Sequence, residues 1–206
     1  MATLLLPGAS TQRAGGRVQT EAPILLLNAS GGETGVSRDI SVGEGRFGGT
    51  VTTISMGKHA LYVGRGDSAY VDVYDGNARP ASAIRTGDLR RILMSKAEFE
   101  KIVRRQLGQT WPDSILKKVL ATARPKFHPL YRDVKVAPDG TVWLTISAAS
   151  DDSTVFRALS AKGSVLGDVR MPHVAQILEP GNDYLLTEYR SGDRAEHVAL
   201  FRVTHK

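Results

Sequence analysis

The sequence contains no cysteine among its 206 residues. This absence excludes disulfide frameworks, thiolate zinc sites and cysteine nucleophiles. Long apolar runs are also missing, because the longest, at residues 4–6 and 23–27, are far too short to cross a membrane as a helix. Residues 1–9 lack the basic start of a secretory signal peptide, so we expect none in this chain.

The composition is otherwise that of an ordinary globular protein, with 41% hydrophobic and 23% charged residues. Its formal net charge is +6, which raises the question of an anionic partner. Residues 88–126 contain ten lysines and arginines but only four acidic residues, so this one segment carries the whole excess. The remainder of the chain is neutral by formal count.

The basic segment also differs from the rest in hydrophobic periodicity. Ser95 and Glu98 form an S-x-x-E capping box at the start of a predicted helix, and helical spacing of apolar residues continues to Gly108. Asp113 is predicted to cap a second helix, which ends at Pro125. We therefore expect a basic pair of helices, an αα-hairpin.

Outside this segment, short β-rich runs alternate with turn-forming residues such as Pro138-Asp139-Gly140, which is typical of strands and hairpins. The runs predicted to form strands are 4–7, 23–27, 35–42, 51–56, 60–64, 70–74, 81–85, 132–136, 141–146, 154–159, 164–170, 174–178, 183–189 and 197–203.

These runs repeat along the chain. Trp143 and Leu185 are taken as equivalent residues 42 positions apart, and Tyr62 precedes Trp143 by the same interval once the 39-residue basic segment is left out. Four strands in a unit of this length are typical of a β-propeller blade. The sequence therefore predicts an all-β fold, a partial β-propeller of about 14 strands in four-stranded antiparallel blades.

The predicted organisation is a single propeller domain with one insertion. Residues 1–87 hold a partial blade and one full blade, and residues 88–126 are the inserted αα-hairpin. Residues 127–206 hold another full blade and a three-stranded terminal blade.

Two stretches resemble a known family. RDVKVAPDGTVWLTIS followed by VFRALSAKGSVLGDVRMP resembles one blade of the six-bladed propellers of the NHL and TolB-like superfamily, and ALYVGRGDSAYVDVYDGNARPASAIR resembles the preceding blade. The helical insertion and the final EHVALFRV resemble bacterial members. The resemblance covers roughly residues 23–203 and implies the fold, because the repeat residues mostly build hairpins and core.

A complete six-bladed propeller has about 24 strands. The resemblance therefore implies that this chain is the C-terminal portion of a longer protein. It implies a periplasmic or exported location for an intact version, although this chain has no signal peptide. The strand at 197–203 would lack an outer neighbour, so we expect self-association through the open propeller edges.

Three residues are candidates for the mouth of the central channel: His128, Tyr131 and His173. Some family members are lyases with histidine-bound metal in this channel. Two histidines from adjacent blades leave a zinc site short of ligands, so we expect no metal and no cofactor. Related esterases use carboxylates on a channel calcium, but Asp75 and Asp133 lie in turn and strand patterns here. The catalytic residues of an enzyme therefore stay unknown.

The αα-hairpin offers a surface for an anionic partner, and four of its residues are candidates: Arg104, Arg105, Lys117 and Lys118. In the alternative interpretation, its apolar stripes pack on each other or on the propeller and its cations are simply solvated. No motif that reads bases accompanies it, so we do not expect nucleic acid as the partner.

The resemblance implies a non-catalytic binding or scaffold module that meets an unidentified protein or small molecule at the propeller rim or channel mouth. Two alternatives stay open. The chain is a fragment of a propeller hydrolase or lyase with a metal in its channel, or it binds an anionic partner through the αα-hairpin.

Overall fold

The computed structural model describes residues 3–5, 10–14, 17–21, 24–27, 33–37, 52–107, 112–121, 124–146, 153–171, 174–191 and 195–204. Its side chains are described from residue 52 onward, except at residues 105–107. Within this part of the chain the fold is all-β with two added helices, as the sequence predicts.

Two four-stranded antiparallel sheets form the middle of the molecule, and in each the strands pair in chain order. The first consists of β6 (Thr52–Met56), β7 (Ala60–Arg65), β8 (Tyr70–Asp75) and β9 (Pro80–Arg85). The second consists of β10 (Tyr131–Val136), β11 (Val142–Ile146), β12 (Thr154–Leu159) and β13 (Val165–Met171). Their bounds agree closely with the predicted runs.

Two three-stranded sheets lie on either side. One consists of β14 (Val174–Pro180), β15 (Tyr184–Arg190) and β16 (Glu196–Arg202), so that β16 has a partner only in β15. The other has the order β1 (Thr3–Leu5), β4 (Ile24–Leu27) and β5 (Glu33–Ser37).

The described residues form sixteen strands, two more than the fourteen predicted. The additional strands, β2 (Ser10–Ala14) and β3 (Arg17–Glu21), pair with each other as an antiparallel hairpin. The sequence between them is Gly15-Gly16, a dipeptide typical of two-residue hairpin loops, so a local signal for this hairpin is present.

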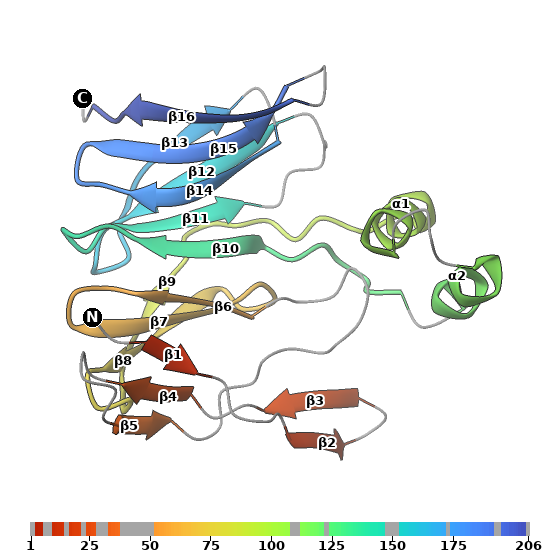
Figure 1. Cartoon of the computed structure of the whole chain (residues 1–206), viewed down its shortest axis with the longest axis horizontal. Helices are drawn as coiled ribbons and strands as arrows, with labels where there is room; N and C mark the ends of the chain where they lie inside the picture. Colours follow the sequence, from red (N-terminus) through yellow and green to blue (C-terminus); the bar gives the residue numbers. More distant parts are fainter. Residues whose placement is uncertain are drawn as a thin grey trace.

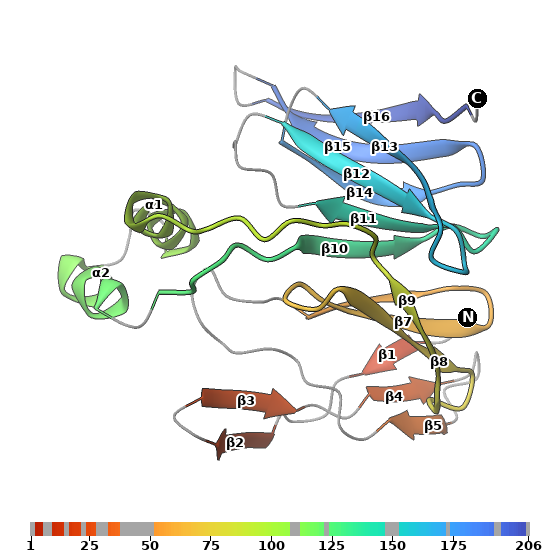
Figure 2. The ribbon, with the colours of Figure 1, turned by 180° about the vertical axis from the view of Figure 1, so that it is seen from behind.

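The sheets follow one another across the molecule. In Figure 1 they run from β1, β4 and β5 at one end, through β6–β9 and β10–β13, to β14–β16 at the other. Figure 2 shows the same order from behind, with both helices projecting from one side. Of these sheets, β6–β9, β10–β13 and β14–β16 pack on one another face to face.

Apolar side chains fill the spaces between these faces. Between the two middle sheets lie Tyr62, Val134 and Leu144, together with further branched residues of β8 and β10. Between β10–β13 and β14–β16 lie Trp143 and Phe156, with Ile177 and Leu185 from the opposite side. The predicted core position of Trp143 is confirmed, since only 4% of its surface is exposed.

The predicted equivalence of Trp143 and Leu185 is wrong by one residue. Trp143 packs against the following sheet, whereas Leu185 packs against the preceding one, as Val142 does. Leu185 is thus the counterpart of Val142, 43 residues earlier. The cause is the length of the turn between the first two strands of each sheet. The hydrogen bond that closes this turn joins residues 137 and 141 in β10–β13 but residues 181 and 184 in β14–β16. A shift of one residue along a strand places each side chain on the opposite face of the sheet.

The predicted αα-hairpin is confirmed as α1 (Lys96–Leu107) and α2 (Asp113–Leu120). The capping box forms as expected, because Glu98 N–H donates to Ser95 Oγ at 3.1 Å and Ser95 N–H donates to Glu98 Oε2 at 2.7 Å. Asp113 does not cap α2; Pro112 occupies the N-cap without a side-chain bond, and Asp113 lies in the first turn, where its charge favours the helix dipole.

The two helices pack on each other through a core of their own. Met94, Phe99, Val103 and Leu116 are buried there, away from the cores between the sheets. Among the described helices, none is long and apolar enough to cross a membrane. The hairpin is therefore a small body attached to the sheets, with its cationic side chains outside its core.

We expect Gly64→Ala to destabilise the protein by about 1–3 kcal/mol through overpacking. A Cβ atom on Gly64 would overlap Val134 Cγ2 and lie 2.9 Å from Tyr131 Cε2, so the sheets would have to separate locally. The matched control is Gly167→Ala in β13, where a Cβ meets no atom within 4 Å. Urea denaturation measures both free energies of unfolding, and equal losses would contradict this packing argument.

Candidate functional site

Of the three candidates for a channel mouth, the structure describes His128 and Tyr131, and both side chains are buried. His173 lies outside the described residues. Tyr131 is 1% exposed, and its hydroxyl donates to the Tyr70 carbonyl at 2.9 Å, so it ties β10 to β8. Burial raises the pKa of this phenol well above its ordinary value. Its surroundings are those of a core residue.

His128 lies where the αα-hairpin joins the second middle sheet. Its side chain is buried, and its Nε2 atom has no hydrogen-bond partner but lies 3.7 Å from Glu98 Oε1. The pKa of Glu98 lies below its ordinary value mainly because of its hydrogen bonds with Ser95, and nearby His128 lowers this pKa further. His128 therefore packs against the capped start of α1.

The four candidates for an anionic-partner surface lie on the two helices. Arg104 is exposed and pairs with Glu100 at 2.7 Å within α1. Lys117 and Lys118 are exposed at the end of α2. The side chain of Arg105 lies outside the described part of the structure. Three of the four thus lie on the helical hairpin with solvent-facing side chains.

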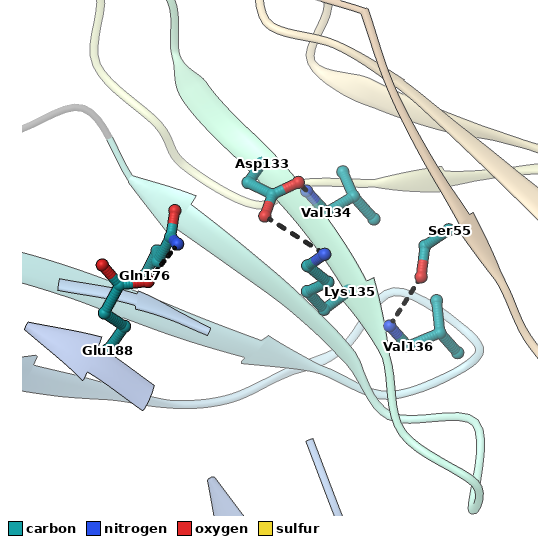
Figure 3. Close-up of polar contacts among 7 residues, drawn as sticks. All are labelled: Ser55, Asp133, Val134, Lys135, Val136, Gln176 and Glu188. Carbon is teal, nitrogen blue, oxygen red and sulfur yellow. Dashed lines mark hydrogen bonds and ion pairs between the residues drawn. The ribbon is translucent and has the colours of Figure 1, made fainter. Parts of the chain in front are cut away.

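Figure 3 shows that the first strands of successive sheets carry polar side chains. Ser55 on β6 accepts a hydrogen bond from Val136 N–H of β10 at 3.1 Å. Asp133 Oδ2 lies 3.9 Å from Lys135 Nζ on the same strand. Removal from water raises the pKa of Asp133, with Lys135 opposing the shift. This carboxylate is the most strongly desolvated acidic group that we describe.

The other carboxylates of interest have structural partners. Asp75 accepts hydrogen bonds from Asn77 N–H and Arg79 N–H, which hold its pKa below the ordinary value and close the β8–β9 turn. Tyr184 donates its hydroxyl proton to Glu179 Oε1 at 2.6 Å. Among the residues that the structure describes, no three histidine or carboxylate side chains gather as metal ligands.

A pocket of about 530 Å³ opens between β13 and the last two strands. This volume falls in the roughly 300–1,000 Å³ range of small-molecule sites. Its residues come from the end of β13, the inner face of β15 and the C-terminal end of β16: Val169, Arg170, Met171, Leu185, Thr187, Tyr189, Phe201, Arg202, Val203 and Thr204. None of these described lining residues is acidic, and two are arginines.

The wall of the pocket contains one polar group without a partner. Thr187 is fully buried, and its Oγ1 makes no hydrogen bond. Beside it, Tyr189 stacks on His197 with ring centroids 5.2 Å apart and tilts against Phe201 at 6.5 Å. A buried hydroxyl left unpaired is destabilising, and Thr53 and Trp143, outside this pocket, also bury a polar atom without a partner.

Sequence reasoning did not find this pocket. Alternation along β15 and β16 does predict that Leu185, Thr187 and Tyr189 share one face, as do Phe201 and Val203. Nothing local indicates that residues 169–171 lie opposite them, because this contact joins strands of two different sheets. A site of this kind becomes visible only with the tertiary structure.

No family model matches the chain, and no curated protein matches it. Among solved structures, the chain is similar to a protein of unknown function from Bacteroides caccae, with 10% sequence identity and a TM-score of 0.40. The match covers 99% of this chain, which spans 59% of the length of that protein. Because that protein has no known function, the match assigns no activity.

We expect Asp133→Asn to raise the melting temperature at pH 7. A carboxyl whose folded-state pKa is raised adds stability below its ordinary pKa of 3.8 and loses it as the pH rises through the raised value. The asparagine is neutral at every pH, so the gain should vanish below pH 3.8. Thermal unfolding followed by circular dichroism at both pH values measures this difference.

Asp168→Asn is the control of opposite sign. The Arg157 side chain hydrogen-bonds Asp168 and holds its pKa below the ordinary value, so this substitution should lower the melting temperature at pH 7. A lower melting temperature for Asp133→Asn as well would contradict the argument, because it would mean that the contact with Lys135 outweighs desolvation.

Proposed function

We propose that this chain is a non-catalytic binding module of the β-propeller type, and that its ligand binds in the pocket between β13 and β15–β16. In a propeller, each sheet is a blade whose first strand lies nearest the central axis. The pocket is then a rim site between two successive blades, lined by their outer strands.

The row of sheets supports the propeller part of this proposal. Successive meanders pack face to face, and the residues equivalent to Val142 recur 43 positions later at Leu185. The helical hairpin lies between β9 and β10, the connection between two blades. A propeller repeat is a four-stranded meander, and its two faces are covered by the neighbouring repeats.

The single observation that carries the binding part is the pocket of about 530 Å³ between β13 and β15–β16. Around it the wall is mainly apolar, with Leu185, Met171 and Phe201, while Arg170 at the end of β13 supplies positive charge. This arrangement favours a ligand with an apolar body and an anionic or hydrogen-bonding group.

We expect Thr187→Val to stabilise the unliganded protein by about 1 kcal/mol, since a buried hydroxyl without a partner is replaced by a methyl group of similar size. The matched control is Thr154→Val, which should destabilise, because Thr154 Oγ1 is buried and accepts a hydrogen bond from Ala175 N–H at 2.9 Å. Urea denaturation distinguishes the two signs.

Thr187→Val and Arg170→Ala should also each weaken, several-fold, the binding of anilinonaphthalene sulfonate, a probe with an apolar body and an anionic group.

Fluorescence titration measures this affinity, and decanoate serves as a competitor of the same general chemistry. Leu178→Lys, on the opposite face of the same sheet, is the control for dye that binds exposed apolar surface. Unchanged dye affinity in both pocket variants would place the dye elsewhere and would overturn the proposed site.

A second candidate function is binding of an anionic partner through the helical hairpin. One observation favours it: the hairpin satisfies its apolar residues within its own core and leaves Lys117 and Lys118 exposed on α2. Its cations are thus presented by a separate body, outside the otherwise neutral sheets.

If the hairpin binds anions, replacing Arg104, Arg105, Lys117 and Lys118 with glutamine should reduce the salt concentration needed for elution from heparin. The control variant replaces four lysines and arginines scattered over the strands and turns of the sheets with glutamine: Lys58, Arg79, Lys135 and Lys162. Equal losses in the two variants would indicate an effect of net charge alone and would contradict a dedicated surface.

A further inference from the structure

The edge of β16 combines unpaired backbone groups with exposed apolar side chains. Val198 and Leu200 are 65% and 63% exposed, although both lie within a strand. The strands in the same position in the two middle sheets, β8 and β12, are each paired with a fourth strand. In the described part of the chain, β16 has no such neighbour beyond β15.

The direction of the free backbone groups follows from the pairing with β15. Val203 N–H donates to the Asp183 carbonyl, and Ser191 N–H donates to the Ala195 carbonyl, so the odd-numbered residues of β16 direct their backbone groups toward β15. By alternation, the even-numbered residues direct their backbone N–H and C=O groups away from β15: Glu196, Val198, Leu200 and Arg202. These same residues carry the side chains of the outer face.

The sequence of β16 is complementary to itself when read in the opposite direction. In an antiparallel pair of two copies centred on Ala199, Glu196 lies opposite Arg202 and Val198 lies opposite Leu200, each contact occurring twice by symmetry. Within one chain Glu196 also pairs with Arg190 of β15, so in the dimer its carboxylate lies between two arginines. All four residues of β16 are the outward-directed ones, so each pair between the copies closes hydrogen bonds between the two backbones. Registers centred on Val198 or Leu200 do not place the two charges opposite each other.

We propose that two copies of this chain associate through β16, antiparallel and centred on Ala199, and form a continuous six-stranded sheet. The proposal commits to a second copy of the chain as the occupant of this edge, because apolar and charged residues of one strand match those of the other. On the inner face, His197 of one copy lies beside Phe201 of the other. The second copy thus adds a wall next to the pocket that Phe201 lines.

The exposed edge of β13 does not offer the same match. Antiparallel pairing of two β13 strands about their middle residue, Asp168, would bring two carboxylates together. The edge of β9 begins with Pro80, which has no N–H to donate. Self-pairing is therefore favoured at β16.

Sedimentation equilibrium of the full chain over a wide range of concentration tests this proposal. We expect a monomer–dimer equilibrium, weakened at least tenfold by Arg202→Glu, which places two acidic residues opposite each other. Glu196→Arg should weaken it similarly. The double variant, with both charges exchanged, should restore part of the association, because the pair between the copies is re-formed with reversed polarity while the pair of Glu196 with Arg190 is lost.

Two further variants separate strand pairing from other modes of contact. Leu200→Pro removes an outward N–H and should abolish the dimer, while circular dichroism reports whether the sheet stays folded. Leu178→Lys changes the same outer face away from the edge and should leave the dimer intact. A chain that is monomeric at its highest soluble concentration, or a double variant without recovery, would overturn the proposal. Loss through Leu178→Lys would instead indicate face-to-face stacking and would also overturn it. All of these measurements use the unliganded chain, so their outcomes are separate from ligand binding in the pocket.

Discussion

Burial of both faces of the sheet β10–β13 is the constraint on which the rest of the structure depends. Val134 and Leu144 face the preceding sheet, and Trp143 and Phe156 face the following one, all at less than 5% exposure. An antiparallel sheet with one apolar face needs one covering layer, whereas this sheet needs two. The neighbouring sheets supply these layers, so the chain grows as a row of sheets.

The same constraint explains where surface is left over. The last sheet, β14–β16, uses Ile177 and Leu185 to cover the face of β10–β13 that carries Trp143 and Phe156. Its opposite face still exposes Val174, Val198 and Leu200. Because it has three strands where the middle sheets have four, the fourth strand of its neighbour, β13, has no counterpart in it. The pocket lies at this boundary, between β13 and β15–β16, and the open edge of β16 is its continuation.

Features set by local sequence could be predicted, and features set by long-range contact could not. The capping box at Ser95, the turn at Asp139 and the strand runs are local, and the structure contains them. The face of Leu185 was predicted wrongly because it depends on one residue of turn length, which periodicity over a 42-residue interval does not resolve. The pocket could not be predicted either, since its walls come from two sheets that meet only in the tertiary structure.

The helical hairpin interrupts this row without disturbing it, because its two ends are held together. Leu93 and Phe127 form an antiparallel bridge, flanked by hydrogen bonds from Met94 N–H to the Lys126 carbonyl and from His128 N–H to the Ile92 carbonyl. A closed connection of this kind costs little more free energy when it is lengthened, so a hairpin with its own core can be accommodated between β9 and β10. The excess positive charge therefore belongs to a body whose packing is independent of the sheets, and the pocket and the basic surface can act separately.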